Sequence, residues 1–251
     1  MKLIQTPDEL HAAVAQLTAE TFIGFDTETT GLDPHRARLR LLQLATPQES
    51  FVIDLFQFPA GALQATLNLL AAPRPIKVAH NAKFDAEFLL KHYGFRLGAV
   101  FDTYLASLLI SAGNENDRHG LEPVAARYLN TELDKSFQVS DWSGELTESQ
   151  LEYAARDAQI LLPLREKLQA KLDEMELMQA AKLEFDCINA IAAMELAGIY
   201  LNADCWRAQA ERTKAVYEKA AVELQKALSA GAPQMSLFEE ATSSINLDSP
   251  A

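Results

Sequence analysis

Apolar residues form short runs in the first hundred residues and recur with helical spacing after them. The short runs, separated by turn residues, predict strands, and the longer periodic stretches predict helices. The expected strands are 22–25, 39–45, 50–55 and 76–79, and the expected helices are 7–20, 61–70 and 81–93. A Thr-Pro-Gln-Glu turn at 46–49 joins two strands as a hairpin, so the first three strands are expected to form an antiparallel meander.

The rest of the chain has the pattern of long helices. Thr147 and Gln150 have the spacing of a capping box, which predicts a helix start there and a helix reaching about Lys171. Two more helices are expected at 177–197 and 203–229. Early strands followed by alternating strand and helix predict an α/β fold: a mixed sheet, with an antiparallel meander and parallel strands, flanked by helices.

The charge of the chain restricts how it can bind nucleic acid. The formal net charge is −13, whereas a protein that holds a phosphate backbone by charge alone is basic. Bound cations or a partner would therefore have to supply positive charge. The N-terminus lacks the pattern of a signal peptide and no apolar run is long enough to span a membrane, so we expect a soluble, cytoplasmic protein without membrane contact.

Two acids stand at the end of the first long strand. Asp26 and Glu28 are two positions apart, so both side chains point to the same side of the strand. Two half-buried carboxylates repel each other unless a cation lies between them, which indicates a divalent metal. The alternative is a solvated surface pair, because the Asp-x-Glu pattern is not specific and occurs again at Asp85-Ala86-Glu87.

Two further motifs carry acids on helices. Asn81 and Asp85 lie at the start of a helix that follows a strand, where they also fit a helix cap and a first-turn acid. Tyr153 and Asp157 are four residues apart and share one helix face. Their alternative is a half-buried tyrosine beside a surface aspartate.

In this order the three motifs resemble the DEDD 3′–5′ exonucleases of the ribonuclease H-like fold. The matching segments are 25–31, 81–85 and 153–157. The resemblance is to the tyrosine branch, because Glu152 stands where the histidine branch has histidine. That branch includes the proofreading domain of family A DNA polymerases and ribonuclease D. The resemblance covers about residues 1–175 and implies an exonuclease domain there.

The resemblance also implies roles for individual residues. Two ions, Mg²⁺ or Mn²⁺, are expected to bind to four carboxylates: Asp26, Glu28, Asp85 and Asp157. Tyr153 is expected to orient the attacking water, since an ordinary tyrosine pKa of about 10 disfavours its acting as the base. Contacts with the terminal nucleotide are expected from Thr29, Asn81 and Lys83.

The C-terminal part suggests partners. Residues 176–230 form a helical extension that resembles the junction between exonuclease and polymerase domains, with the match at 193–201, and 231–251 are expected to be a flexible tail. Residues 245–251 resemble the opening of a polymerase motif, which points to a fragment or relic of a longer polymerase. In the tail, Gln234, Leu237 and Phe238 resemble a peptide that binds the sliding clamp, the alternative being a local hydrophobic anchor.

The resemblance thus implies a metal-dependent 3′–5′ exonuclease that acts on the 3′ end of single-stranded DNA. One alternative is a ribonuclease D-like enzyme that trims RNA, because both use the same five residues. A second is a non-catalytic module that binds strand ends or a partner. Such a module would be expected to lack one of the acids, and all are present.

Overall fold

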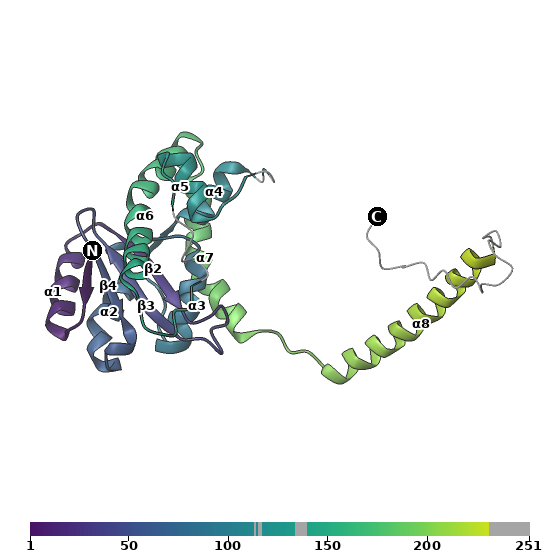
Figure 1. The fold of residues 1–251 in the computed structure, drawn as a ribbon. Helices are drawn as coiled ribbons and strands as arrows, with labels where there is room; N and C mark the ends of the chain where they lie inside the picture. Colours follow the sequence, from purple (N-terminus) through teal and green to yellow (C-terminus); the bar gives the residue numbers. More distant parts are fainter. Residues whose placement is uncertain (113, 115–116, 134–139, 231–251) are drawn as a thin grey trace. The chain divides into compact units, whose positions relative to one another are not determined.

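The computed structural model describes residues 1–112, 114, 117–133 and 140–230 (Figure 1). A six-stranded sheet has the order β1-β4-β3-β2-β5-β6. The strands are β1 (Lys2–Ile4), β2 (Phe22–Thr29), β3 (Leu39–Ala45), β4 (Ser50–Asp54), β5 (Ile76–Ala79) and β6 (Val100–Asp102). The helices are α1 (Pro7–Thr18), α2 (Gln64–Ala71), α3 (Ala82–Tyr93), α4 (Thr103–Ser111), α5 (Leu121–Leu129), α6 (Glu148–Glu174), α7 (Met178–Ala197) and α8 (Ala203–Ala230).

The pairing of the strands confirms the predicted mixed sheet. β2, β3 and β4 pair antiparallel as a meander, and β5 and β6 continue the sheet in parallel beside β2. β1, which pairs in parallel with β4, and β6 were not predicted. Each of these two strands has three residues, which is too short for an alternating pattern to show in the sequence.

One face of the sheet is covered by α6, which crosses it in Figure 1. The predicted capping box starts this helix. The backbone N–H of Gln150 donates to Thr147 Oγ1 (3.2 Å), and the backbone N–H of Thr147 donates to Gln150 Oε1 (2.9 Å). A small apolar cluster fills the space between sheet and helix, formed by Leu41, Val52, Trp142, Leu151, Ala154 and Ala155. The catalytic candidates on α6 are thereby held over the sheet.

The main core lies on the other face of the sheet, because its strand residues alternate with those of the small cluster. Leu42, Leu44 and Ile53 belong to it, together with Leu10 of α1 and Phe88 of α3. The second half of α6 and the buried side of α7 complete it. Apolar burial on this scale is the principal stabilising term of such a fold.

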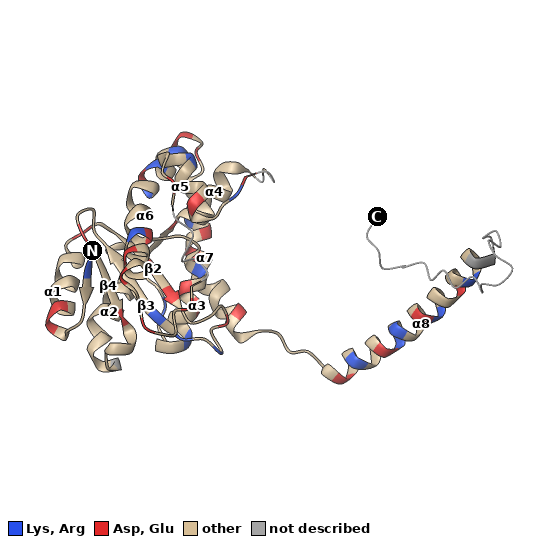
Figure 2. Ribbon diagram, in the orientation of Figure 1, with Lys and Arg blue, Asp and Glu red and all other residues tan. Residues whose placement is uncertain are grey.

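The chain divides into two units, Met1–Gly198 and Ile199–Ala251. Within the first unit α7 packs against α3 and α4, while the predicted domain boundary at residue 175 stays a prediction. In the second unit α8 carries acidic and basic residues in turn along its length (Figure 2). In the part of the chain that the structure describes, no helix has the length and apolar character of a membrane span.

Candidate active site

The first two acids project from the end of β2 towards α6. Asp26 and Glu28 are both half-buried. Gly24 lies on the same face two residues earlier, and a side chain there would collide with the backbone of α6. A register shift between Glu28 and Thr29 ends the regular pairing with β3. The strand therefore delivers both carboxylates to its own end, beneath the helix.

Asp85 enters the site from α3. It is 3% exposed, and the Thr27 hydroxyl donates to its Oδ1 at 2.5 Å. Thr27 lies between the two acids of β2 and fixes the α3 carboxylate relative to the strand. The hydrogen bond joins segments 58 residues apart, so the fold and not the local sequence sets this distance.

The N-terminus of α3 is capped from another strand. Asn81 occupies the cap position in a left-handed conformation (φ 64°), but its side chain makes no capping hydrogen bond. The Asp102 carboxylate instead accepts from the Asn81 and Ala82 N–H groups (3.1 and 2.8 Å) and from two N–H groups at the start of α4. The side-chain cap considered for Asn81 is therefore wrong, and Asp102 has a structural role.

Asp157 and Tyr153 reach the site from α6. Asp157 is 8% exposed, and the Tyr153 hydroxyl interacts with its carboxylate across one helical turn. Ala158, the next residue, has its carbonyl oxygen at 2.0 Å from where a side-chain carbon on Gly24 would stand. This close approach of α6 to β2 brings Asp157 to the acids of the strand.

Electrostatics within the acid cluster (Asp26, Glu28, Asp85 and Asp157) favour protonation. Burial raises the pKa of Glu28 to about 8, and the nearby Asp157 and Asp85 add to the shift. Burial also raises the pKa of Asp85 to about 7 and that of Asp157 to about 6. For Asp26, burial and then the three neighbouring carboxylates raise the pKa well above its usual range. The cluster is thus short of positive charge.

A divalent cation fits the cluster in donor type and charge. Among the described side chains, none of the four acids forms an ion pair, and hard carboxylate oxygens are the ligands that Mg²⁺ and Mn²⁺ prefer. No three acidic, histidine or cysteine side chains of the described residues already surround one point as a finished metal site. The fit therefore rests on the donor type, the charge and the burial of the four acids.

The raised pKa values predict how the metal-free protein responds to pH. A carboxyl group whose pKa is raised on folding stabilises the fold below its unfolded pKa, and that stability is lost as the pH rises through the folded value. For Glu28 the loss extends from about pH 4.5 to about pH 8. We expect Glu28→Gln to melt at a higher temperature than the wild type in EDTA, by a margin that grows from pH 5 to pH 8.

Thermal unfolding of both proteins across this range measures that margin. The difference between the two melting temperatures at each pH cancels the contribution of groups that both proteins share. One such group is the buried His80, whose pKa is lowered by burial to about 4. Added Mg²⁺ should raise the melting temperature of the wild type more at pH 8 than at pH 5, because metal binding competes with protons. A margin that is constant with pH would contradict the prediction.

Of the three residues expected to contact the terminal nucleotide, Thr29, Asn81 and Lys83, the first and the last have side-chain partners within the protein. The Thr29 hydroxyl donates to the Gly31 carbonyl at 2.7 Å. Lys83 Nζ lies 2.5 Å from Glu195 Oε2 on α7 and 3.8 Å from Glu87 Oε1. Their proposed role in nucleotide binding stays a prediction. The clamp-binding residues Gln234, Leu237 and Phe238 lie outside the described residues.

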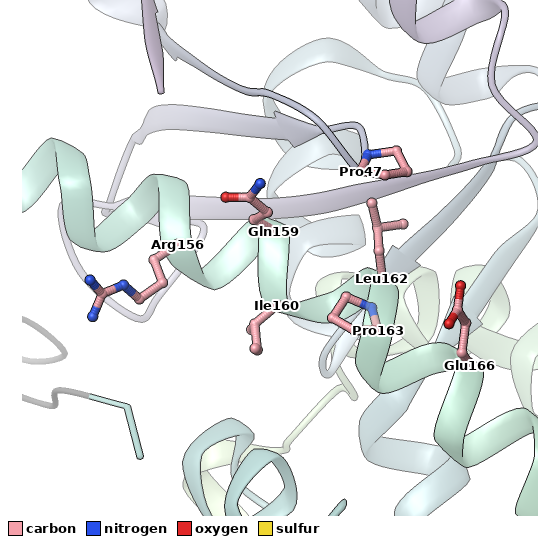
Figure 3. A pocket seen from close by; sticks show the side chains of 7 residues that line it. All are labelled: Pro47, Arg156, Gln159, Ile160, Leu162, Pro163 and Glu166. Carbon is pink, nitrogen blue, oxygen red and sulfur yellow. The ribbon is translucent and has the colours of Figure 1, made fainter. Parts of the chain in front are cut away.

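A cavity of about 430 Å³ lies along the part of α6 that follows the acid cluster. Figure 3 shows its lining: Pro47, Arg156, Gln159, Ile160, Leu162, Pro163 and Glu166. Arg156 is exposed, forms no ion pair with a described residue, and lowers the pKa of Asp157 through its charge. The sequence alone does not single out Arg156, because one arginine within a helix belongs to no pattern.

Comparisons with known proteins give the family. The family model DNA_pol_A_exo1, described as a 3'-5' exonuclease, matches residues 1–173. DNA polymerase I of Aquifex aeolicus is 34% identical over 196 residues, covering 75% of this chain and 32% of the polymerase. Ribonuclease D of Gluconacetobacter diazotrophicus is 34% identical over 175 residues, covering 69% of this chain and 43% of the relative. The chain thus spans less than half the length of these two relatives.

Solved structures of similar proteins support the same family. Brucella melitensis NrnC with bound Mg²⁺ is 30% identical, with a TM-score of 0.65, and the match covers 72% of this chain and 88% of that one. The same protein bound to pGG matches with a TM-score of 0.66. From the converging acids, the sheet that carries them and these matches, we conclude that the chain belongs to the 3′–5′ exonuclease family with the DEDD fold.

Proposed function

We propose that this exonuclease removes nucleotides one at a time from the 3′ end of single-stranded DNA, with two divalent metal ions, as proofreading domains do. The observation that carries the proposal is the acid cluster: four carboxylates from three elements converge, and no cationic side chain neutralises them. DNA is favoured by the polymerase relative, which matches a larger share of the chain than the ribonuclease D relative, 75% against 69%.

In this mechanism the side chains of the chain divide the work. Two bound ions would stabilise the attacking and the leaving oxygen of an in-line displacement at phosphorus. Asp26, Glu28 and Asp157 would hold the ion nearer the attacking water, and Asp26 and Asp85 the second. The Thr27 hydroxyl keeps Asp85 in place through its hydrogen bond.

Tyr153 orients the attacking water and does not take its proton. Burial and the adjacent Asp157 raise the pKa of Tyr153 above its ordinary value of about 10. Its hydroxyl is therefore protonated at neutral pH and acts as a hydrogen-bond donor. A protonated phenol serves as a fixed positioning group, and positioning alone contributes a large part of such catalysis.

RNA is the second candidate substrate, and one observation favours it. The ribonuclease D relative is as similar as the polymerase relative, at 34% identity. The acid cluster acts on the phosphate and not on the sugar, so it does not separate the two substrates. The NrnC structure bound to pGG adds short oligonucleotides as a third class. A non-catalytic strand-end module is disfavoured, since none of the four acids is replaced.

The experiment is hydrolysis of three 5′-labelled substrates of matched sequence: single-stranded DNA, RNA and a dinucleotide. Each is incubated with Mg²⁺, Mn²⁺ or EDTA, and an Asp26→Asn preparation controls for contaminating nucleases. We expect a ladder of DNA shortened from the 3′ end, stopped by EDTA. Cleavage of RNA alone, or of the dinucleotide alone, would move the assignment to that substrate. If no substrate is cut, the chain is a binding module.

A further inference from the structure

Gln43 is a fully buried amide with no hydrogen-bond partner. It stands in the middle of β3, a central strand, and its side chain is 0% exposed. Neither its Nε2 nor its Oε1 has a partner in the structure. Buried amides are costly to desolvate and are almost always hydrogen-bonded in folded proteins. A residue of this kind at the centre of a sheet calls for a function.

The strand pairing places Gln43 beside the acid cluster. Gln43 is directly opposite Asp26 of β2 and, on its other side, opposite Val52 of β4. Directly opposed residues of an antiparallel pair point to the same face, with Cβ atoms about 4.5–5.5 Å apart. Of these two cross-strand neighbours only Asp26 is polar. The unpartnered amide and the Asp26 carboxylate therefore share one face of the sheet.

From this juxtaposition we propose that Gln43 is a positioning residue: when metal binds, its side-chain N–H donates to the Asp26 carboxylate and holds it in the orientation that binds the ion. The inference rests on the proposed metal-dependent function. Metal-ligating carboxylates are commonly held by a hydrogen bond from a neighbouring side chain, which fixes the oxygen that faces the ion. The α6 helix covers Gln43, so water does not compete for its amide.

A purely structural Gln43 would behave differently on substitution. If the amide only fills space, a side chain of the same shape without polar atoms serves equally well, and removing an unpartnered buried group does not destabilise the protein. Methionine has this shape, because it is unbranched and of similar length. Metal affinity separates the two roles, since a space-filling residue has no effect on it.

The test is Mn²⁺ binding to Gln43→Met and to the wild type, measured by isothermal titration calorimetry. We expect the Kd for Mn²⁺ to rise about 10- to 100-fold in the variant, the usual effect of losing a hydrogen bond to a metal ligand. The melting temperature in EDTA should stay equal or rise. Thr66→Val is the matched control: it also removes an unpartnered, fully buried polar atom, on α2, and should leave the Kd unchanged.

An unchanged Kd in a folded Gln43→Met protein overturns the inference and leaves the proposed function intact. Failure of the wild type to bind Mn²⁺ overturns both. If Gln43→Met does not fold, NMR of the wild-type protein tests the inference instead. Added Mg²⁺ should then shift the side-chain amide resonance of Gln43 and leave that of Gln150, which is bound to the Asp141 carbonyl, in place. An unmoved Gln43 resonance overturns the inference.

Discussion

Asp26→Asn is expected to abolish hydrolysis while the protein stays folded. The pKa of Asp26 is raised well above its usual range, because burial and the other three carboxylates all act on it. Asparagine keeps its shape but removes the charge that would hold both ions. Metal ions contribute several kcal/mol to stabilising the transition state, and about 4 kcal/mol corresponds to about a 10³-fold loss of rate. We therefore expect kcat on the preferred substrate to fall by about 10³-fold or more.

The control for this variant is Glu152→Gln. Glu152 is an exposed acid on α6, one residue from Tyr153, and its carboxylate does not belong to the acid cluster. Its loss should change kcat little. The melting temperature of metal-free Asp26→Asn should not fall, because the substitution relieves repulsion inside the cluster. Wild-type kcat in Asp26→Asn, and likewise in Asp157→Asn, would be incompatible with the proposed catalytic site.

Gly24→Ala is expected to destabilise the fold and inactivate the site together. The added carbon would stand 2.0 Å from the Ala158 carbonyl oxygen and 3.3 Å from the Ala45 side chain. The first contact is with backbone, so α6 or β2 has to move. Overpacking of a tight core commonly costs about 1–3 kcal/mol, and a backbone collision belongs at the upper end or beyond. For a chain of this size about 3 kcal/mol lowers the melting temperature by about 6–12 °C.

The same movement should separate Asp157 from the acids of β2, because Asp157 precedes Ala158 on the helix. We expect activity to fall even at temperatures where the variant remains folded. Gly61→Ala is the matched control, since nothing lies within 4 Å of an added carbon there. Thermal unfolding and hydrolysis assays on both variants measure the two effects. Equal melting temperatures for Gly24→Ala and the wild type would rule out the close packing of α6 on β2.

Much of the fold follows from local signals in the sequence. The apolar runs predict the antiparallel meander, and the capping box marks the start of α6, because each signal lies within a short window of chain. The two three-residue strands escape prediction, since pairing with neighbours and not pattern defines them. The α/β class and the elements with clear local patterns thus follow from the sequence, whereas the two short strands do not.

The candidate site divides in the same way. Its motifs name the five residues of the proposed chemistry, and the structure brings Asp26, Glu28, Asp85 and Asp157 close enough to shift one another's pKa. Other features depend on segments far apart. Lys83 is paired with Glu195, 112 residues away. The cap of α3 comes from Asp102 and not from Asn81. No window of sequence contains both members of such a pair.

The sequence by itself determined the class of fold, the antiparallel meander and the motifs that carry the four acids. Only the tertiary structure decided that α6 approaches β2 closely at Gly24, and that Gln43 is buried without a partner opposite Asp26. The physical reason is that residue type and spacing are fixed by the chain, whereas burial and pKa depend on what packs around each group.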